Sequence, residues 1–187
     1  MLNCYLSPQK NRDLKKRILA ISGSIRSNSS NIQIINAVKN LYSNQLDIEI
    51  FSSIANLPHF NPDLDNDDLL PEKVKLFRKK IAESDGVLIS TPEYIFSIPG
   101  CLKSALEWTV GSMVLSEKPL ALITASGLGN KAHEELLMIM KTIYGNYQDE
   151  TQLLISGARL KVNDDGFIDE GTRIAIENLM IHFITMM

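Results

Sequence analysis

Five short apolar runs alternate along the chain with longer stretches in which apolar residues recur every three or four positions. Such recurrence is typical of amphipathic helices, as in the set Ile32, Ile35, Val38 and Leu41. The runs themselves are continuously apolar, as are strands that are buried on both faces of a parallel sheet. The alternation predicts an α/β fold, a doubly wound parallel sheet with helices on both faces. The five predicted strands cover residues 17–22, 46–51, 86–91, 119–126 and 151–157.

Length and composition fit one globular domain. The chain has 187 residues, of which 44% are hydrophobic and 22% charged, so we expect a single domain over residues 16–187. Residues 1–15 contain no predicted element, and we expect them to be a poorly ordered N-terminal extension. The segment NPDLDNDD, residues 61–68, is expected to be a solvated loop before a helix that starts at Pro71.

The net charge and the cysteines indicate which partners to expect and in which cellular compartment the protein works. A formal net charge of −3 gives no large basic field, so nucleic acid is not an expected partner. No apolar run approaches the roughly 18 residues of a membrane span, and the first residues lack the apolar core of a signal peptide. Cys4 and Cys101 match no metal-ligand spacing, and free thiols fit a reducing compartment. We therefore expect a cytoplasmic protein with no metal site and no membrane partner.

The loop after the first predicted strand reads GSIRSNSSN, residues 23–31. In an open parallel sheet, ligands bind outside the carboxyl ends of the strands, where the strand order reverses. The start of the next helix offers free backbone N–H groups, and small hydroxyl side chains let a phosphate approach closely. Arg26 adds a forked cation, the only fixed full charge of the loop. We interpret the loop as a phosphate site, with plain helix capping by serine and asparagine as the alternative.

The loop after the third predicted strand reads TPEYIFSIPG, residues 91–100. Its two prolines restrict the backbone, and Pro99 suits the first turn of the next helix. Tyr94, Ile95 and Phe96 place apolar surface at the ligand-binding edge of the sheet, where exposure is unfavourable unless something covers it. A planar heterocycle would be one such cover, and a subunit interface would be the other.

A glycine-rich turn follows the fourth predicted strand. GLGNKA, residues 127–132, matches G-x-G-x-x-A, but a dinucleotide-binding fingerprint belongs after the first strand and needs an acidic residue at the end of the next one. The chain also lacks the P-loop motif G-x-x-x-x-G-K-[ST]. We interpret the turn as one that lets the backbone approach a ligand closely.

Three segments together resemble the NADPH-dependent FMN reductase family, from residue 17 to residue 185. GSIRSNSSN resembles the family's phosphate loop, G-S-x-R-x-x-S-x-N, and TPEYIFSIPGCLKSALEW resembles its flavin-ring loop and the following helix. SGLGNKAHEELLMIM and GARLKVNDDGFIDEGTR resemble its last third. The chain departs from the usual residues at three positions: Ile95 and Ser104 stand where asparagine is usual, and Asn130 stands where glycine is common.

The resemblance implies a flavodoxin-like fold with strand order 2-1-3-4-5 and an FMN-dependent NAD(P)H oxidoreductase. In such an enzyme the flavin carries the chemistry, taking hydride from NADPH or NADH and passing electrons to a small acceptor: a flavin, a quinone, an azo compound or a metal oxyanion. The resemblance implies no catalytic side chain, and it implies a homodimer or a homotetramer. The implied cofactor-binding residues are Ser24, Arg26, Ser29 and Asn31 for the phosphate, Pro92, Glu93, Tyr94 and Ile95 for one side of the ring, and Ser126, Gly127, Leu128 and Gly129 for the other.

Two other functions fit the same sequence. A flavodoxin-like electron carrier would bind FMN without reacting with NAD(P)H, and a scaffold module would have lost flavin binding. The phosphate interpretation also predicts a ligand order. FMN should bind more tightly than riboflavin, which has no phosphate, and more tightly than FAD, whose adenylate needs room beyond the loop.

Overall fold

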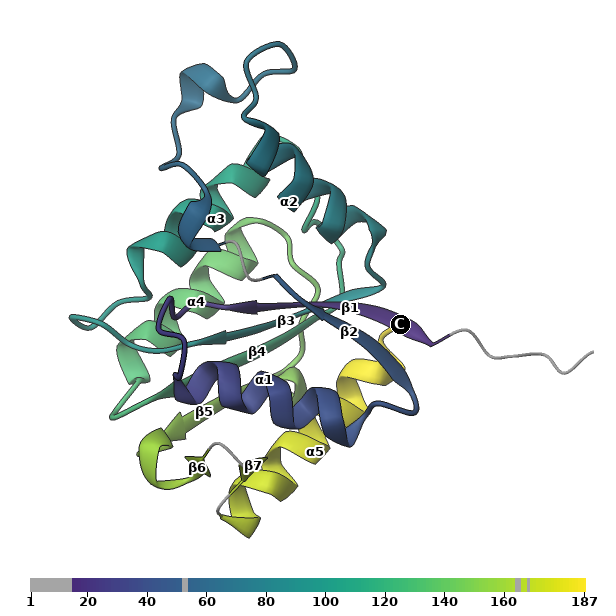
Figure 1. Cartoon of the computed structure of the whole chain (residues 1–187), viewed down its shortest axis with the longest axis vertical. Helices are drawn as coiled ribbons and strands as arrows, with labels where there is room; N and C mark the ends of the chain where they lie inside the picture. Colours follow the sequence, from purple (N-terminus) through teal and green to yellow (C-terminus); the bar gives the residue numbers. More distant parts are fainter. Residues whose placement is uncertain (1–14, 52–53, 164–165, 168) are drawn as a thin grey trace, which may run out of the picture.

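The computed structural model describes residues 15–51, 54–163, 166–167 and 169–187. The expected N-terminal extension lies outside the described residues, except for Lys15. Five parallel strands form one sheet in the order β2-β1-β3-β4-β5 (Figure 1), which confirms the predicted order. The strands are β1 (Lys16–Ser22), β2 (Leu46–Ile50), β3 (Gly86–Thr91), β4 (Leu120–Ser126) and β5 (Gln152–Ser156).

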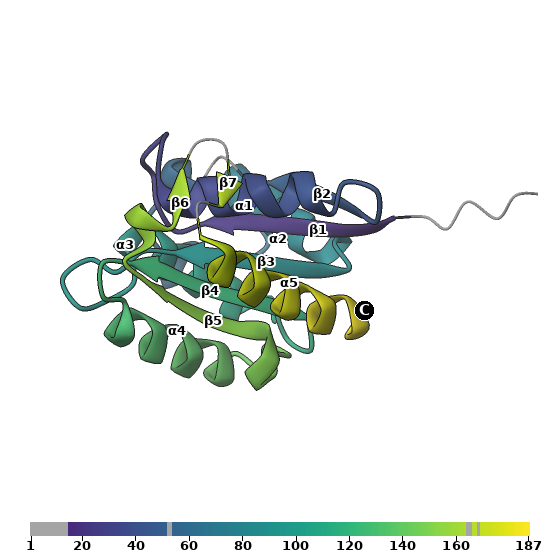
Figure 2. The same ribbon diagram turned by 90° about the horizontal axis from the view of Figure 1, so that it is seen from below.

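Five helices cover the two faces of this sheet. Figure 1 shows α2, α3 and α4 on one face and α1 and α5 on the other, and Figure 2 shows α1 and α5 lying along the strands. The predicted doubly wound arrangement is therefore confirmed. The helices are α1 (Ser30–Leu41), α2 (Glu72–Glu83), α3 (Gly100–Val110), α4 (Asn130–Thr142) and α5 (Glu170–Thr185).

Alternate residues of the strands contribute to two separate hydrophobic cores. In β1, Ile18 and Ala20 belong to the core under α1 and α5, whereas Leu19 and Ile21 belong to the core under α2, α3 and α4. All four residues are at most 2% exposed, and burial of one large apolar side chain contributes about 1.5–3 kcal/mol. The strand is apolar at each of these positions because helices cover both of its faces.

Several short elements had no counterpart among the predicted ones. Two strands of two residues form an antiparallel pair that lies beside α1 (Figure 2), and the described part of the chain has four short 3-10 helices in its loops. Elements this short show no periodicity in the sequence, so only their tertiary contacts define them. They are β6 (Val162–Asn163), β7 (Gly166–Phe167), η1 (Ile54–Asn56), η2 (Pro62–Leu64), η3 (Asp149–Thr151) and η4 (Ala158–Leu160).

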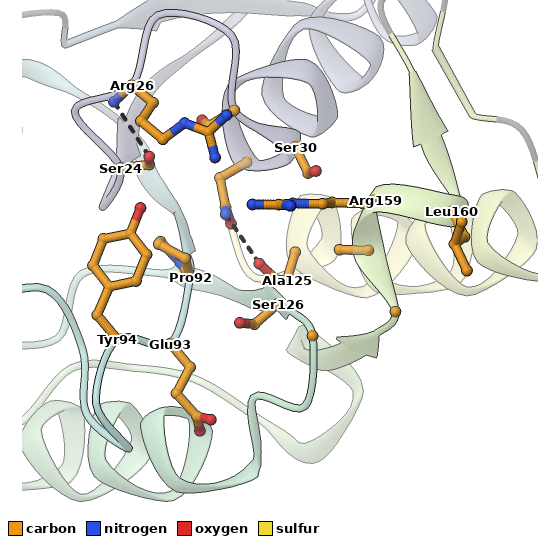
Figure 3. A pocket seen from close by; sticks show the side chains of 15 residues that line it. Ser24, Arg26, Ser30, Pro92, Glu93, Tyr94, Ala125, Ser126, Arg159 and Leu160 are labelled. Atoms are coloured by element: carbon orange, nitrogen blue, oxygen red, sulfur yellow. Dashed lines mark hydrogen bonds between the residues drawn. The ribbon is translucent and has the colours of Figure 1, made fainter.

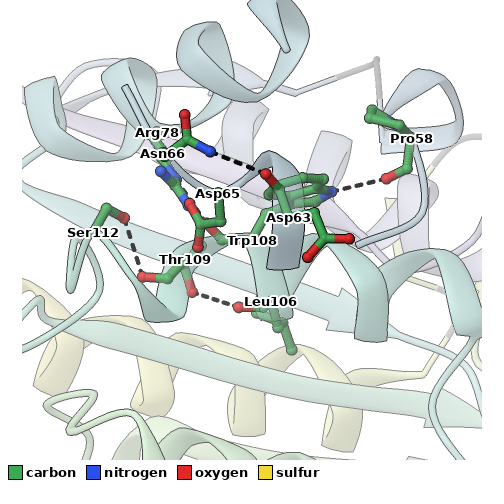
Figure 4. Close-up of polar contacts among 9 residues, drawn as sticks. All are labelled: Pro58, Asp63, Asp65, Asn66, Arg78, Leu106, Trp108, Thr109 and Ser112. Atoms are coloured by element: carbon green, nitrogen blue, oxygen red, sulfur yellow. Dashed lines mark hydrogen bonds and ion pairs between the residues drawn. The ribbon is translucent and has the colours of Figure 1, made fainter. Parts of the chain in front are cut away.

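Most of residues 61–68, between β2 and α2, are exposed, as expected of a solvated loop, but the centre of this segment is attached to the rest of the domain (Figure 4). Asp65 pairs with Arg78 of α2, and both side chains are only 13% exposed. Arg78 Nε also donates to the carbonyl oxygen of Trp108 at 2.6 Å, and the indole of Trp108 donates to the carbonyl oxygen of Pro58 at 2.8 Å. Ser104, one of the departures from the family pattern, accepts from the amide of Phe60 at 2.8 Å.

The loops after β1 and β3 lie side by side, because the strand order reverses between these two strands. The amide of Gly23 donates to the carbonyl oxygen of Ser90 at 2.8 Å. A Cβ atom at Gly23 would lie 2.3 Å from Oγ1 of Thr91, so only glycine fits where the two loops meet. Among the described residues, no helix is long and apolar enough to cross a membrane.

Candidate functional site

A cavity of about 350 Å³ opens at the carboxyl ends of the strands (Figure 3). Its walls come from the loops after β1, β3, β4 and β5, at the place where ligands bind in sheets of this order. Most of the predicted cofactor-binding residues line it: Ser24, Arg26, Ser29, Asn31, Pro92, Glu93, Tyr94, Ser126 and Gly127. Ile95, Leu128 and Gly129 do not line this cavity.

The wall formed by residues 23–31 presents a helix start to the cavity. Ser29 caps α1, since its hydroxyl oxygen accepts from the amide of Ile32 at 3.2 Å. The hydroxyl of Ser24 accepts from the amide of Arg26 at 3.3 Å and thereby shapes the loop. The first amides of a helix have no partner within it, and the helix dipole favours an anion there. The cap formed by Ser29 therefore leaves this helix start suited to an anion, so the two interpretations of the loop do not exclude each other.

Asn31 has a structural role for its side chain. The residue is 2% exposed, and its Nδ2 donates to the carbonyl oxygen of Ala125 at 3.0 Å. Its Oδ1 accepts from the hydroxyl of Ser90 at 2.8 Å. The side chain thus ties the start of α1 to β3 and β4 through both of its polar atoms.

Glu93 caps a helix on the opposite wall. One oxygen of its carboxylate accepts from the amides of Lys131 at 2.9 Å and Ala132 at 3.0 Å, in the first turn of α4. The N-cap position of α4 is Gly129, which has φ of 94° and no side chain to cap with. Glu93 supplies the missing acceptor from another loop, so its carboxylate points at α4 and not at the centre of the cavity.

A second carboxylate fastens the same loop to α4. Glu135 accepts from the hydroxyl of Ser97 at 2.6 Å and from the amide of Ile98 at 2.9 Å. The loop of residues 92–99 is therefore held to α4 at both ends. This attachment fixes the position of Tyr94, which lines the cavity.

The tip of this loop is a tight turn with an unusual backbone. Tyr94 and Ser97 exchange backbone hydrogen bonds of 2.9 and 3.1 Å. Between them Ile95 and Phe96 have φ of 51° and 57°, a left-handed conformation that is unfavourable for residues other than glycine and asparagine, above all for a β-branched one. Ile95 is 95% exposed, so its side chain gains nothing from packing within this chain.

One wall was not predicted from the sequence. Gly157, Ala158, Arg159 and Leu160, directly after β5, line the cavity together with Ser30 and Ala125. Figure 3 shows the side chains of Arg26 and Arg159 on the side of the cavity where Ser30 lies. The rule that ligands bind at the carboxyl ends of the strands would have indicated residues after the fifth strand too. Arg26 is therefore the only full charge of its loop, but it is not the only arginine of the cavity.

The pKa values of His133 and Cys101 are shifted, and neither residue lines the cavity. Burial lowers the pKa of His133, whose Nδ1 contacts the hydroxyl of Thr124 and whose Nε2 contacts Oε1 of Gln152, both at 2.9 Å. Burial raises the pKa of the Cys101 thiol, which keeps it protonated near neutral pH. Among the described residues, no group of three or more His, Cys, Asp or Glu side chains is arranged to hold a metal ion.

The cavity combines two kinds of surface. Two guanidinium groups, a helix start and serine hydroxyls suit a phosphate. The aromatic ring of Tyr94 and the ring of Pro92 form a less polar wall of the same cavity, which Gly127 also lines. The arrangement fits a flat ligand that carries a terminal phosphate.

Comparison with known proteins agrees with this chemistry. The sequence profile of the NADPH-dependent FMN reductase family matches residues 16–159. A 2-hydroxy-1,4-benzoquinone reductase of a Burkholderia species is 39% identical over 113 residues, which span 59% of this chain and 60% of that protein. NADH-dependent flavin reductase subunit 2 of Lactobacillus johnsonii is 32% identical over 180 residues, 90% of this chain and 95% of that protein. The solved structure of a flavoenzyme NAD(P)H:(acceptor) oxidoreductase from Paracoccus denitrificans has 25% identity and a TM-score of 0.71, with 91% of this chain and 96% of that chain covered.

Proposed function

This chain belongs to the NADPH-dependent FMN reductase family, and we propose that it holds FMN in the cavity at the carboxyl edge of the sheet. The protein is of the class of FMN-dependent oxidoreductases that use NAD(P)H as electron donor. We further propose that residues 16–187 form a single FMN-binding domain. The observation that carries the cofactor site is the presence of two arginines and the start of α1 at one end of a cavity whose other walls suit a flat ring.

Each wall has a task in this proposal. Ser24, Arg26 and Ser29, with the first amides of α1, bind the phosphate. Pro92 and Tyr94 support one side of the ring, and the backbone from Ser126 to Gly127 approaches it from another side. Glu93 acts indirectly, because it fixes the loop and α4 relative to each other.

The chemistry that FMN supplies when bound is uptake of hydride from NAD(P)H and delivery of electrons to a second substrate. The side chains that line the cavity then need only to bind, orient and exclude water. We propose that the acceptor is a small molecule: a flavin, a quinone, an azo compound or a metal oxyanion. The named activities of the relatives, on a benzoquinone and on flavin, support the first two classes.

We also propose that the chain forms a homodimer or a homotetramer in the cytoplasm. Exposed apolar side chains of Val110, Met113, Met138 and Tyr144 line two neighbouring grooves beside α3 and α4, and apolar surface of this kind is typical of protein interfaces. Light scattering of the wild type and of Met138→Lys checks this. We expect an oligomer that the lysine weakens, and a monomeric wild type would contradict the proposal.

Flavin titration of the apoprotein tests the cofactor site. We expect wild type to bind FMN more tightly than riboflavin, and Arg26→Ala to lose about one power of ten or more in FMN affinity. Riboflavin affinity should change little, because riboflavin has no phosphate for Arg26 to bind. Equal losses for the two flavins would show that Arg26 supports the loop instead of binding phosphate.

Addition of NADPH or NADH to the FMN-loaded protein tests the reaction. Loss of the visible flavin absorbance supports the reductase. Absorbance that persists would favour the electron carrier, and absence of any FMN binding would favour the scaffold module.

A further inference from the structure

We infer that Arg159 is a second phosphate-binding arginine, and that the pair Arg26 and Arg159 makes the cavity selective for a phosphate monoester. The inference rests on the proposed FMN site and deepens it. It concerns a residue after β5, outside the three segments to which the phosphate and the ring were assigned from the sequence.

The turn that carries Arg159 has a fixed position. Gly157, with φ of 68°, precedes η4, and its amide donates to the carbonyl oxygen of Gly127 at 3.0 Å. The hydroxyl of Ser156 donates to the carbonyl oxygen of Leu128 at 2.7 Å. Two hydrogen bonds therefore hold this turn against the loop after β4. Ala158, which is 2% exposed, anchors it in the core under α1 and α5.

The guanidinium group of Arg159 is available to a ligand. Neither Arg26 nor Arg159 takes part in an ion pair among the described residues. By contrast, Arg78 and Arg173 are both paired with carboxylates. Figure 3 shows the side chain of Arg159 extending across the cavity toward the Ser30 side, where Arg26 also lies. The two arginines come from opposite ends of the chain and from different walls.

The charge of the lining matches a dianion. A terminal phosphate monoester carries about −1.5 to −2 charges at pH 7 on one group, whereas FAD distributes a similar total over two linked phosphates, each of which carries about −1. Glu93 is the carboxylate of the lining, and it is directed at the amides of Lys131 and Ala132. Two arginines and a helix start therefore face the phosphate without a directly opposing anion. Two arginines that meet at one point match the concentrated charge of the terminal phosphate of FMN better than the linked phosphates of FAD, and riboflavin has no phosphate for them to bind.

Flavin fluorescence titrations of the apoprotein test the inference with FMN, riboflavin and FAD. We expect Arg159→Gln to weaken FMN binding roughly tenfold, as expected for loss of one charge-assisted hydrogen bond, with riboflavin affinity changed less than about twofold. The preference for FMN over FAD should shrink as well. Lys161→Gln is the matched control, since Lys161 ends the same turn but does not line the cavity, and its FMN affinity should equal that of wild type.

The outcomes separate this inference from the proposed function. A wild type that prefers FMN, together with an Arg159→Gln variant that keeps the full preference, overturns the role of Arg159 alone. Equal losses for FMN and riboflavin in Arg159→Gln overturn it too, because they indicate a structural role for the turn. A wild type with no preference for FMN over riboflavin overturns both the phosphate site and the second arginine.

Discussion

The loops after β1 and β3 form two walls of one cavity, but their charged side chains differ in what they contact. In residues 23–31, the loop bends so that Arg26, the hydroxyls and the first amides of α1 face the cavity. In residues 92–99, the polar groups are used within the protein, because Glu93 and Glu135 join this loop to α4. The first wall therefore leaves charged and polar groups available at the cavity, whereas the second is held rigidly to the rest of the domain.

This difference shows that a polar residue in a binding loop is not thereby a ligand-binding residue. Asn31 lies in the loop of the first wall, but its side chain has a structural role like that of Glu93 in the second wall. Both ends of its side-chain amide form hydrogen bonds with residues of β3 and β4. The two kinds can be separated by experiment. Substitution of a residue with a structural role should change the free energy of unfolding. Substitution of a residue that binds the ligand should change the affinity for one class of ligand.

The largest effect is expected for Asn31→Ala. The change leaves the hydroxyl of buried Ser90 and the carbonyl oxygen of Ala125 without their partner, and we expect the free energy of unfolding to fall by about 2–4 kcal/mol. Urea unfolding measures it. Ser30→Ala, at the next position and also in the cavity lining, is the control, with an expected change below about 0.5 kcal/mol. An Asn31→Ala protein of wild-type stability that binds FMN poorly would place Asn31 among the ligand-binding residues instead.

Glu93→Ala should have the next largest effect. It removes a charged acceptor from two amides at the start of α4, which we expect to lower the free energy of unfolding by about 2 kcal/mol. Thermal unfolding should shift down by roughly 4–8 °C. Glu134→Ala removes a carboxylate from an exposed pair with Lys131 on the same helix and should change stability by less than about 0.5 kcal/mol. Similar effects of the two variants would contradict the capping role.

Ile95→Asn should stabilise the protein. Asparagine tolerates the left-handed backbone of this turn better than a β-branched residue, so we expect a gain of about 1 kcal/mol in the free energy of unfolding. Ile25→Asn is the control, because Ile25 is also exposed but has no positive φ. A loss of stability in Ile95→Asn would show that the isoleucine side chain has a favourable contact, as it would in a subunit interface.

The smallest expected effect is the contribution of His133, a residue of α4, to the pH dependence of stability. Burial lowers the pKa of His133 below its ordinary 6.5. At a pH between the two values the unfolded chain binds a proton that the folded chain does not, so stability falls as pH drops below 6.5 and levels off below the folded-state pKa. Unfolding of wild type and His133→Gln between about pH 8 and pH 5 should show a shallower loss in the variant. If the stability of the two proteins has the same pH dependence, His133 is not the cause of the loss.

Much of the fold could be predicted from the sequence. The apolar runs locate the strands to within about a residue of their bounds, because the central strands are covered on both faces. The edge strand β2 instead alternates buried Leu46 and Ile48 with exposed Asp47 and Glu49. The predicted family, fold class, cofactor and class of enzyme are confirmed. The pair β6 and β7 could not be predicted, because its position depends on contact with α1 and not on local pattern.

The site could be predicted by residue type but not by partner. The hydrogen bonds of Glu93 reach residues 38 and 39 positions away, and that of Asn31 reaches Ala125, 94 positions away. Such partners follow from the packed arrangement of loops and not from the spacing of residues in a motif. Arg159 was missed for a related reason: its segment, GARLKVNDDGFIDEGTR, resembles the family but was given no role in ligand binding, and the position of its turn is what brings Arg159 to the cavity.

The division into two cores has a consequence for the order in which the chain can fold as it is synthesised. The core under α2, α3 and α4 uses buried residues from Leu19 to Met140, whereas the core under α1 and α5 needs residues up to Phe183. A ribosome that has just released β5 into solution has therefore delivered every strand of the parallel sheet and the three helices that cover one face, while the other face still lacks Ile176, Leu179 and Phe183. Until α5 emerges, an apolar strip of the sheet stays open to water, and a chaperone that binds nascent apolar surface would find it there.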